Sequence, residues 1–579
     1  MSRTGRPVAA LSLLVCIAGV AWAQPAEPPV MLQWYEQQWT DMERRVPDFF
    51  LAGYGSVWLP PVSKAASQQS VGYDVFDRFD LGRPGSPTLY GTEQSFRAVV
   101  DELQQANGRV YVDSILNHNS FRETSATFQQ RGGWPGFWMD PQSPLRQKFP
   151  TDPWGDFHAG VPGGYLQSED PGGPRYDLFR GDLVALVDID QTTNHQFIRH
   201  PIEPGHPDNI PAGTVHNRPD PANVRFYPDR TQPGQTVVVP PTSRAGSVTL
   251  TFYPYTENPE DGVPFMENAT GVLMRWTQWM LEVQGVDGFR LDAVKHTYPF
   301  FWDQYFDGVM RNRWTTPDGR TATPFSFGES VADNAFVFNN FVRKNDGFGN
   351  RDALDLNGAA RLRELINAGG FGDWASLENA GGGHIDLIDD GFINGSVGVN
   401  HVFSHDNGSV GDGGSMPPLP TDRQMGLFAH AYTLMRPGHT IVYYNARAVQ
   451  RSFGFFPREG TPIALGFDER AGALDDRMTR LVRARNTVAR GQYIPLQRDS
   501  DVIVFERSSP NNISGGRDGQ ALVGVNDRFD TGFDTRTVNT SFAPGTRLHE
   551  ISGTAGDPVV DPTNQIFSVV TVGAGGQAT

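Results

Sequence analysis

Short apolar segments alternate with amphipathic helical segments over most of this chain, and the alternation limits its possible folds more than any other feature. Eight segments have the length and apolar character of buried strands: 30–35, 55–60, 109–117, 285–294, 324–329, 353–356, 396–404 and 440–444. Helical patterns lie between most of them, as at 92–106, 270–283 and 358–368. This alternation predicts a (β/α)8 TIM barrel, which gathers its functional residues at the C-terminal ends of the strands.

Two regions interrupt the alternation. After the third strand, a stretch of about 150 residues rich in Gly, Pro, Trp and Asp is too long for a simple loop and predicts an inserted subdomain. Near the C-terminus, short β-type runs predict a small antiparallel β-sandwich domain. The predicted domains are a barrel in two parts, 24–118 and 265–490, an insertion at 119–264 and a C-terminal domain at 491–579.

The first 23 residues have the pattern of an export signal. Arg3 and Arg6 precede an apolar run, and Ala21-Trp-Ala23 is a small-residue cleavage site, so we expect cleavage after Ala23 and secretion to the periplasm or the medium. The single cysteine, Cys16, lies in this segment, so we expect no disulfide in the mature chain. No other run of about 20 apolar residues occurs, so we expect no membrane attachment after cleavage.

Composition excludes two classes of protein. With 38% hydrophobic and 11% aromatic residues, the chain can bury a large core and is not globally disordered. Its net charge of −17 gives no basic surface for a nucleic acid, which we do not expect as a partner. We expect the mature protein to be a monomer.

Polar residues follow four of the predicted strands. They are Asp113, Asn117 and His118 at the third strand, Arg290, Asp292, Lys295 and His296 at the fourth, Glu329 at the fifth, and His405 and Asp406 at the seventh. In a barrel these ends meet at one face, so three acids from separate strands can surround one ligand. For each acid taken singly, a helix cap, a turn or a surface position remains an alternative.

The fourth strand is the most informative. Arg290 and Asp292 are two residues apart and therefore point to the same side of a strand. The guanidinium would hold the aspartate ionised, as a covalent nucleophile requires, although a buried structural ion pair has the same pattern. Glu329 follows Gly328 and an apolar run, where desolvation would suit a general acid. A nucleophile and an acid about 5 Å apart form the arrangement of a retaining glycosidase.

Together, these segments resemble the conserved regions of the α-amylase family, glycoside hydrolase family 13. The N-terminal part is most similar to bacterial liquefying-type α-amylases, through Met31-Leu-Gln-Trp-Tyr, Val57-Trp-Leu-Pro-Pro, Val71-Gly-Tyr-Asp-Val-Phe-Asp and Tyr90-Gly-Thr. The resemblance implies that Asp292 is the nucleophile, Glu329 the general acid/base and Asp406 the stabiliser of the transition state.

The same resemblance implies roles for other residues. Arg290 would hold the nucleophile, His118 and His405 would bond the sugar ring at the cleavage point, and Tyr73 would be the aromatic platform beneath that ring. Lys295 and His296 match a pair that lines the leaving-group side in members that cut long α-1,4-glucans. The implied activity is endo-hydrolysis of starch-type glucans.

The resemblance also implies a calcium ion between the barrel and the insertion. Its ligands would be Asn117, Asp182, Asp188 and the backbone carbonyl of His296. Oxygen ligands of this kind suit Ca²⁺.

Two alternatives to a hydrolase remain. A transglycosylase of the same family would use the same acids, and only the shape of the acceptor side would separate the two. A non-catalytic glucan-binding protein should lack at least one acid, whereas this chain has all three. The stretch 199–264 is longer than is usual in the family, which leaves product size open.

Overall fold

The computed structural model describes most of the chain after residue 27. The described residues are 28–121, 158, 166–192, 227–256, 269–312, 314–317, 319, 324–342, 351–379, 398–407, 423–449, 456, 461–468, 471–511, 513–528, 533–558 and 560–579. The expected signal peptide and much of the expected insertion, including 193–226, lie outside the described residues.

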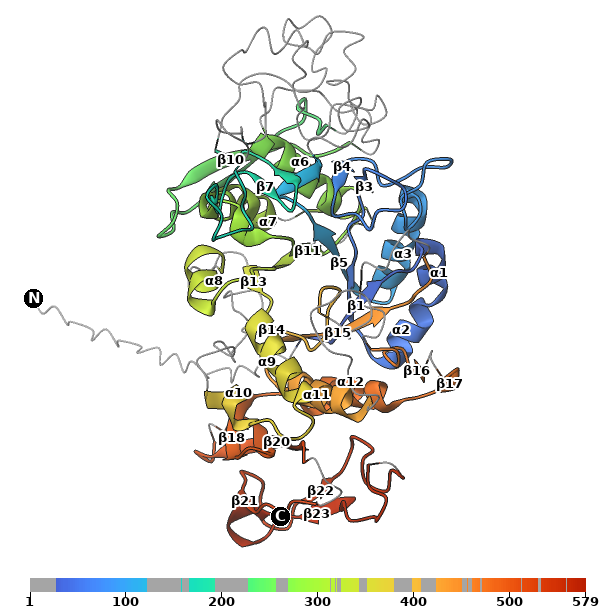
Figure 1. Ribbon diagram of the computed structural model, residues 1–579, viewed down its shortest axis with the longest axis vertical. Helices are drawn as coiled ribbons and strands as arrows, with labels where there is room; N and C mark the ends of the chain where they lie inside the picture. The colour runs from blue at the N-terminus through green and yellow to red at the C-terminus, as the bar shows by residue number, and fades with distance from the viewer. Residues whose placement is uncertain are drawn as a thin grey trace, which may run out of the picture.

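Eight parallel strands form the central sheet. They are β1 (Met31–Tyr35), β2 (Ser56–Leu59), β5 (Arg109–Ser114), β11 (Gly288–Leu291), β12 (Phe325–Gly328), β13 (Arg351–Ala353), β14 (Val399–Asn400) and β15 (His439–Asn445). The sheet order is β13-β12-β11-β5-β2-β1-β15-β14, and a parallel bridge between Leu354 and Val399 joins its two ends (Figure 1). The predicted (β/α)8 barrel is therefore confirmed.

Helices follow the strands along the chain. They are α1 (Trp39–Arg44), α2 (Val46–Ala52), α3 (Glu93–Gln105), α6 (Ala269–Glu282), α7 (Asp307–Arg311), α8 (Asn334–Asn340), α9 (Leu356–Asn367), α10 (Ala375–Asn379), α11 (Arg423–Met435) and α12 (Arg477–Val488), with short helical turns η2 (Val294–His296), η3 (Phe301–Phe306) and η4 (Ala574–Gly576). Helix α3 illustrates how the sequence forms these helices. Thr92 caps its first turn, and Phe96, Val99 and Leu103 recur on one buried face.

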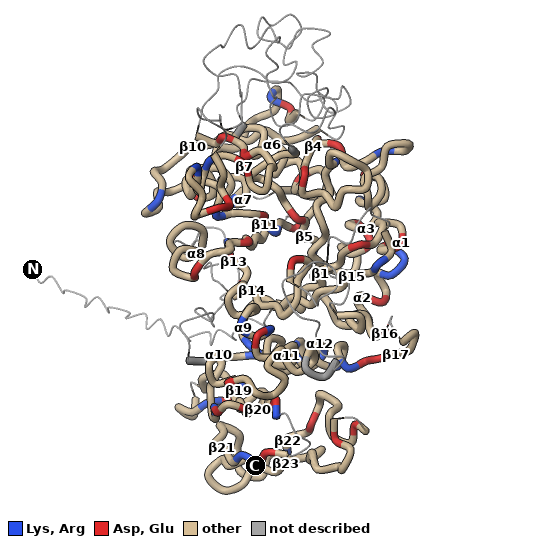
Figure 2. Tube along the Cα trace, viewed as in Figure 1, with Lys and Arg blue, Asp and Glu red and all other residues tan. Residues whose placement is uncertain are grey.

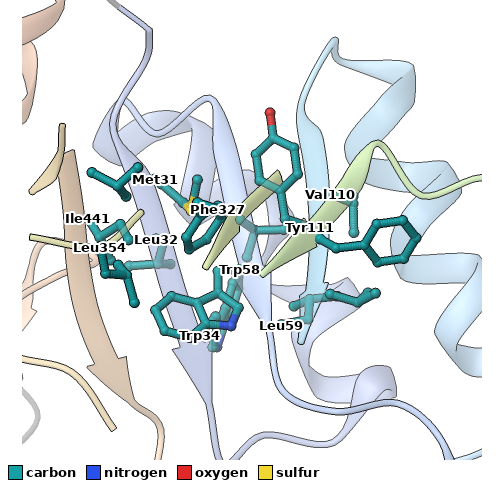
Figure 3. Close-up of a cluster of buried hydrophobic side chains, with 14 of the residues drawn as sticks. Met31, Leu32, Trp34, Trp58, Leu59, Val110, Tyr111, Phe327, Leu354 and Ile441 are labelled. Atoms are coloured by element: carbon teal, nitrogen blue, oxygen red, sulfur yellow. The ribbon is translucent and has the colours of Figure 1, made fainter. Parts of the chain in front are cut away.

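Large apolar side chains fill the space inside and around the barrel strands. Trp34, Trp58 and Phe327 are buried, and Figure 3 shows them packed with residues from neighbouring strands. Gly288 allows β11 to approach β12, because a Cβ there would lie 1.9 Å from the carbonyl oxygen of Phe325. This close strand pairing fixes the direction of the residues that follow β11.

The described part of the insertion consists of small antiparallel sheets. Strand β6 (His118–Phe121) pairs with β8 (Leu186–Asp188), which pairs with β7 (Asp182–Leu183). A separate hairpin joins β9 (Gln235–Val239) to β10 (Val248–Phe252). A further ribbon in the β2–α3 connection joins β3 (Lys64–Ala65) to β4 (Val75–Asp77).

A buried ion-pair network attaches the β9–β10 hairpin to the barrel. Asp303, on the π-helical turn η3, lies 2.6 Å from Arg244 in the hairpin and 2.5 Å from Arg351 on β13. Thr242 donates to the same carboxylate at 2.6 Å. Burial alone would raise the pKa of Asp303, but Arg351 and Arg244 lower it to about 2. Asp303 thus pairs with one arginine of the hairpin and one arginine of the barrel, and Arg351 also pairs with Asp307 at 2.7 Å.

The C-terminal region is antiparallel, as expected. Its main sheet has the order β18 (Gln492–Arg498), β19 (Val502–Pro510), β20 (Arg517–Asn526). Short pairs complete it: β21 (Val538–Asn539) with β24 (Gln577–Ala578), and β22 (Arg547–His549) with β23 (Val569–Thr571). The ribbon of β16 (Phe467–Asp468) and β17 (Ala473–Leu474) precedes α12. The boundaries of the predicted domains stay predictions.

Two barrel strands differ from their predicted positions. The sixth was expected at 353–356, but β13 ends at Ala353 because the side chain of Asp355 caps α9 through the backbone N–H of Gly358 at 2.8 Å. The seventh, expected at 396–404, is only Val399–Asn400 within the described residues. His405 and Asp406 therefore stand on the loop after β14 rather than on the strand itself.

Acidic and basic residues are interspersed along the described chain (Figure 2). Among the helices that the structure describes, none is long and apolar enough to cross a membrane.

Candidate active site

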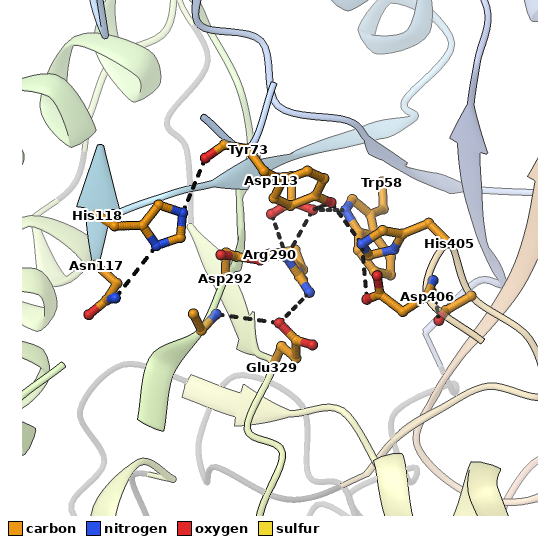
Figure 4. A network of polar contacts seen from close by, with 12 residues as sticks. Trp58, Tyr73, Asp113, Asn117, His118, Arg290, Asp292, Glu329, His405 and Asp406 are labelled. Carbon is orange, nitrogen blue, oxygen red and sulfur yellow. Dashed lines mark hydrogen bonds and ion pairs between the residues drawn. The ribbon is translucent and has the colours of Figure 1, made fainter. Parts of the chain in front are cut away.

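Residues from six separate segments meet at the C-terminal face of the barrel (Figure 4). Asp113 lies on β5, Arg290 on β11 with Asp292 directly after it, and Glu329 directly after β12. Tyr73 comes from the β3–β4 ribbon, His118 from β6, and His405 and Asp406 from the loop after β14. The structure thus brings together the three acids that the sequence predicted.

Arg290 is the centre of this site and is only 1% exposed. Its Nη1 lies 2.8 Å from Asp113 and 2.6 Å from Asp292, and its Nη2 lies 2.8 Å from Glu329. Burial alone would lower the pKa of Arg290, but the three carboxylates raise it well above its usual value. One guanidinium therefore fixes three acids, and the two expected catalytic carboxylates bind its adjacent nitrogens.

The pKa of Asp292 differs from the sequence expectation. Arg290 does lower it, but burial is the larger effect, and Glu329 and Asp113 add to it, so the pKa is raised well above the usual carboxyl value. The pattern Arg290-x-Asp292 reveals the arginine but not the two acids, which come from other strands. Because one cation cannot neutralise three carboxylates, these acids together retain a proton up to a higher pH than an isolated aspartate does.

Backbone geometry also positions the acids. Ala293, directly after Asp292, has a left-handed conformation with φ of 51°, which costs energy in a residue with a Cβ. Its N–H lies 3.4 Å from Oε2 of Glu329. Gly328 precedes Glu329 where a Cβ would lie 2.4 Å from the ring of Phe341. The two acids are thus held by their strands as well as by Arg290.

Asp113 is a site residue to which the sequence analysis assigned no role. Its carboxylate accepts from Tyr35 at 2.8 Å and Tyr73 at 2.7 Å, and from the indole of Trp58 at 3.3 Å, besides its bond to Arg290. Its position near the end of a predicted strand is the sequence feature that could have identified it as a site residue. Asp113 links the arginine to the aromatic side of the site.

The two predicted sugar-binding histidines are buried and neutral. Burial lowers the pKa of both His118 and His405 to about 3. His118 bonds the carbonyl of Tyr73 at 3.1 Å, and the ring of Tyr73 is parallel to that of His405 with centroids 5.5 Å apart. Asp406 is the most open of the acids, with 46% of its side chain exposed.

Lys295 and His296 point in different directions. Lys295 donates to the carbonyl of Val331 at 2.9 Å, beyond β12. The ring of His296 is buried against the carbonyl of Leu178 at 3.1 Å, and burial lowers its pKa to about 4. In this structure, therefore, Lys295 stays at the barrel mouth, whereas the His296 ring contacts the insertion.

Three of the expected calcium ligands, Asn117, Asp182 and Asp188, lie close together between the barrel and the insertion. Asp188 is fully buried, and its Oδ1 accepts from Asn117 at 2.8 Å. Its Oδ2 has no hydrogen-bond partner among the described residues. Burial raises the pKa of Asp188, and the carboxylates of Asp182 and Glu169 raise it further. Glu169 was not among the predicted ligands, because no sequence motif marks it, and its charge acts on Asp188 in addition to that of Asp182.

A buried carboxylate with one oxygen that lacks a hydrogen bond among the described residues, close to the charge of Asp182, suits a cation. Among the described residues, no three His, Cys, Asp or Glu side chains are grouped closely enough to hold a metal by themselves. The expected set has only two carboxylates, Asp182 and Asp188, with an amide and a backbone carbonyl. The donor types therefore fit Ca²⁺.

No protein-family model matches this chain. Parts of it are nevertheless similar in sequence to known proteins. It is 28% identical over 297 residues to the cytoplasmic α-amylase of Escherichia coli strain K12, covering 49% of this chain and 50% of the relative. It is 22% identical over 355 residues to the α-amylase of Geobacillus stearothermophilus, covering 58% and 54%. A variant of α-amylase I from Eisenia fetida, solved with maltohexaose, has a TM-score of 0.54 at 17% identity and covers 96% of this chain and 95% of its own.

The chain spans about half the length of the curated relatives that it matches. A barrel whose C-terminal face holds one arginine among three carboxylates is typical of a glycoside hydrolase. The fold, the site and the curated relatives support assignment of the chain to the α-amylase family, glycoside hydrolase family 13.

Proposed function

We propose that this protein is a secreted, retaining, endo-acting α-amylase that hydrolyses internal α-1,4-glucosidic bonds of starch, glycogen and related glucans. The observation that carries the proposal is the bonding of Asp292 and Glu329 to adjacent nitrogens of Arg290, with Asp406 at the same barrel mouth. The family of the curated relatives supports an α-glucan as the substrate.

In this proposal, each carboxylate oxygen of Asp292 and Glu329 has its own role. Arg290 binds Oδ1 of Asp292, so Oδ2 is the oxygen that attacks the anomeric carbon. It also binds Oε2 of Glu329, so Oε1 carries the proton that goes to the glycosidic oxygen. Glu329 then deprotonates a water molecule, which hydrolyses the β-glucosyl-enzyme. The sugar product is released with retained anomeric configuration. The surplus of negative charge favours the oxocarbenium-like transition state, and Asp406 holds sugar hydroxyls.

The proposal includes a calcium ion held by Asn117, Asp182, Asp188 and the carbonyl of His296. When bound, the ion would neutralise the buried acids and join the insertion to the barrel. It would take no part in the reaction. Export of the mature chain after cleavage at Ala23 is also part of the proposal, on the basis of the N-terminal sequence alone.

The test of the proposed function is the purified protein on soluble starch with calcium, followed by the chain-length distribution. Rapid loss of iodine colour with short reducing products supports endo-hydrolysis. Larger or cyclic products with little new reducing power would instead show a transglycosylase. Binding of starch without any change of chain length would show a non-catalytic protein.

The acid limb of the pH profile should lie above the ordinary carboxyl pKa of about 4. The nucleophile must be ionised, and the pKa of Asp292 is raised, so kcat/KM should rise as pH increases through that raised value. His118 and His405 stay neutral over this range and should not contribute. Initial rates on a soluble maltooligosaccharide measure the limb, and an apparent pKa at or below the ordinary value would contradict this assignment.

Removal of calcium should lower the melting temperature. Binding at 100 times the dissociation constant contributes about 2.7 kcal/mol, which corresponds to a shift of a few degrees. Asp188→Asn should abolish the calcium-dependent shift and the bound calcium measured by elemental analysis. Asp170→Asn, at an exposed turn of the same segment, is the control and should keep both. An unchanged calcium response in the Asp188 variant would remove Asp188 from the site.

A further inference from the structure

Gln33 on β1 is a fully buried polar residue whose amide touches the active site. Its Nε2 lies 2.7 Å from Nδ1 of His405. We propose that Gln33 is a positioning residue that keeps the proton of His405 on Nε2, directed at Asp406 and Tyr73. The consequence for catalysis rests on the proposed function, whereas the position of the proton does not.

Tyr73 has a single hydroxyl hydrogen. The hydroxyl lies 2.7 Å from Oδ2 of Asp113, which is paired with Arg290 and can only accept. Tyr35 donates to the same oxygen at 2.8 Å. The hydrogen of Tyr73 goes to the charged Asp113 at 2.7 Å rather than to the hydroxyl of Tyr35 at 3.2 Å, and the Tyr73 hydroxyl then accepts from Nε2 of His405 at 2.8 Å.

Asp406 requires the same arrangement. Its Oδ2 lies 3.1 Å from Nε2 of His405, so both neighbours of this nitrogen need a donor. Because the ring is neutral, it has one N–H, and that hydrogen must be on Nε2. Nδ1 is then an acceptor, and its partner must donate.

Gln33 supplies that donor through its Nε2–H group, which leaves its own amide oxygen, Oε1, buried and without a hydrogen-bond partner among the described residues. Turning the amide over would give this oxygen a partner only if His405 moved its hydrogen to Nδ1. The Nε2 lone pair would then face the Asp406 carboxylate. The chain Gln33 to His405 to Tyr73 to Asp113 thus has one consistent direction of donation.

The test is Gln33→Glu, studied by ¹⁵N–¹H correlation of the histidine rings and by kinetics on soluble maltooligosaccharides. A carboxylate can only accept, so His405 should change from the Nε2–H form to the Nδ1–H or doubly protonated form. We expect kcat to fall by about 10–100-fold, more than KM changes, with a shifted pH profile. Comparison with His405→Gln assigns the ring signals.

Two further variants separate positioning from packing. Gln33→Met keeps the volume but removes the donor, so Asp406 and Tyr73 alone should hold the Nε2–H form, which should be only partly populated, with a smaller loss of kcat than in Gln33→Glu. Gln37→Glu also puts a carboxylate on a buried glutamine near β1, but its partner, Trp34, donates to it at 2.6 Å, so His405 should be unchanged. An unchanged His405 tautomer in Gln33→Glu, or equal losses of kcat in Gln33→Glu and Gln33→Met, would overturn the proposal. The tautomer remains measurable even if the protein does not hydrolyse starch.

Discussion

Replacing Asp292 with asparagine should lower starch hydrolysis by at least about 10⁴-fold while the barrel stays folded. The amide keeps an oxygen that can accept from Arg290 at the present 2.6 Å, so the site should retain its shape. It cannot form the covalent bond to the sugar, and no other acid directly replaces it: Asp113 is buried beneath the aromatic residues, and Glu329 must donate the proton. Release of reducing ends measures the effect, and circular dichroism checks the fold.

The matched control is Asp48→Asn, which removes a half-exposed carboxylate paired with Arg45. It should leave the rate unchanged. If Asp292→Asn kept more than about a tenth of the rate, Asp292 would not be the nucleophile, and the roles proposed for the site would have to be reassigned.

Asp303→Asn should lower the free energy of unfolding by about 3–5 kcal/mol. The carboxylate is 1% exposed and binds the guanidinium groups of Arg244 and Arg351. Without its charge, Arg244 and Arg351 lose their shared partner, Arg351 keeps its ion pair with Asp307, and the ion pair between the β9–β10 hairpin and the barrel is lost. Urea unfolding followed by tryptophan fluorescence measures the change.

The sign of the pH dependence gives an independent check. The pKa of Asp303 is lowered to about 2, so its stabilising effect is full above the ordinary carboxyl pKa and is lost as pH falls through that value towards 2. The difference between wild type and variant should shrink accordingly. Glu364→Gln, which breaks the exposed pair with Arg361, is the control and should cost about 1 kcal/mol or less. Equal effects of the two substitutions would contradict the role of Asp303.

Much of the barrel could be predicted because its strands are buried on both faces and are therefore continuous apolar runs. The acids could be predicted because they directly follow those runs, as Asp292 and Glu329 do. The sixth and seventh strands are short, and their ends depend on a cap, Asp355, and on a bridge, Leu354 to Val399, that no local pattern reveals. Lengths of such strands are decided by tertiary pairing.

The remaining features depend on distances across the fold. The raised pKa of Asp292 results mainly from burial, and Glu329 and Asp113, which are far apart in the sequence but bind the same arginine, raise it further. Gln33 lies within a motif that the sequence analysis quoted, but its contact with His405 spans 372 positions. Such partners become visible only once the strands are placed around the barrel. The domain boundaries and export of the chain stay predictions.

The most direct test of the central claim is to trap the covalent intermediate. In Glu329→Gln, an α-maltosyl fluoride can still form the glycosyl-enzyme because fluoride leaves without an acid, whereas hydrolysis is slow without the base. Peptide mapping by mass spectrometry should find the sugar on the peptide that contains Asp292. A sugar attached to any other residue, or rapid turnover to an inverted product without a covalent species, would contradict the account.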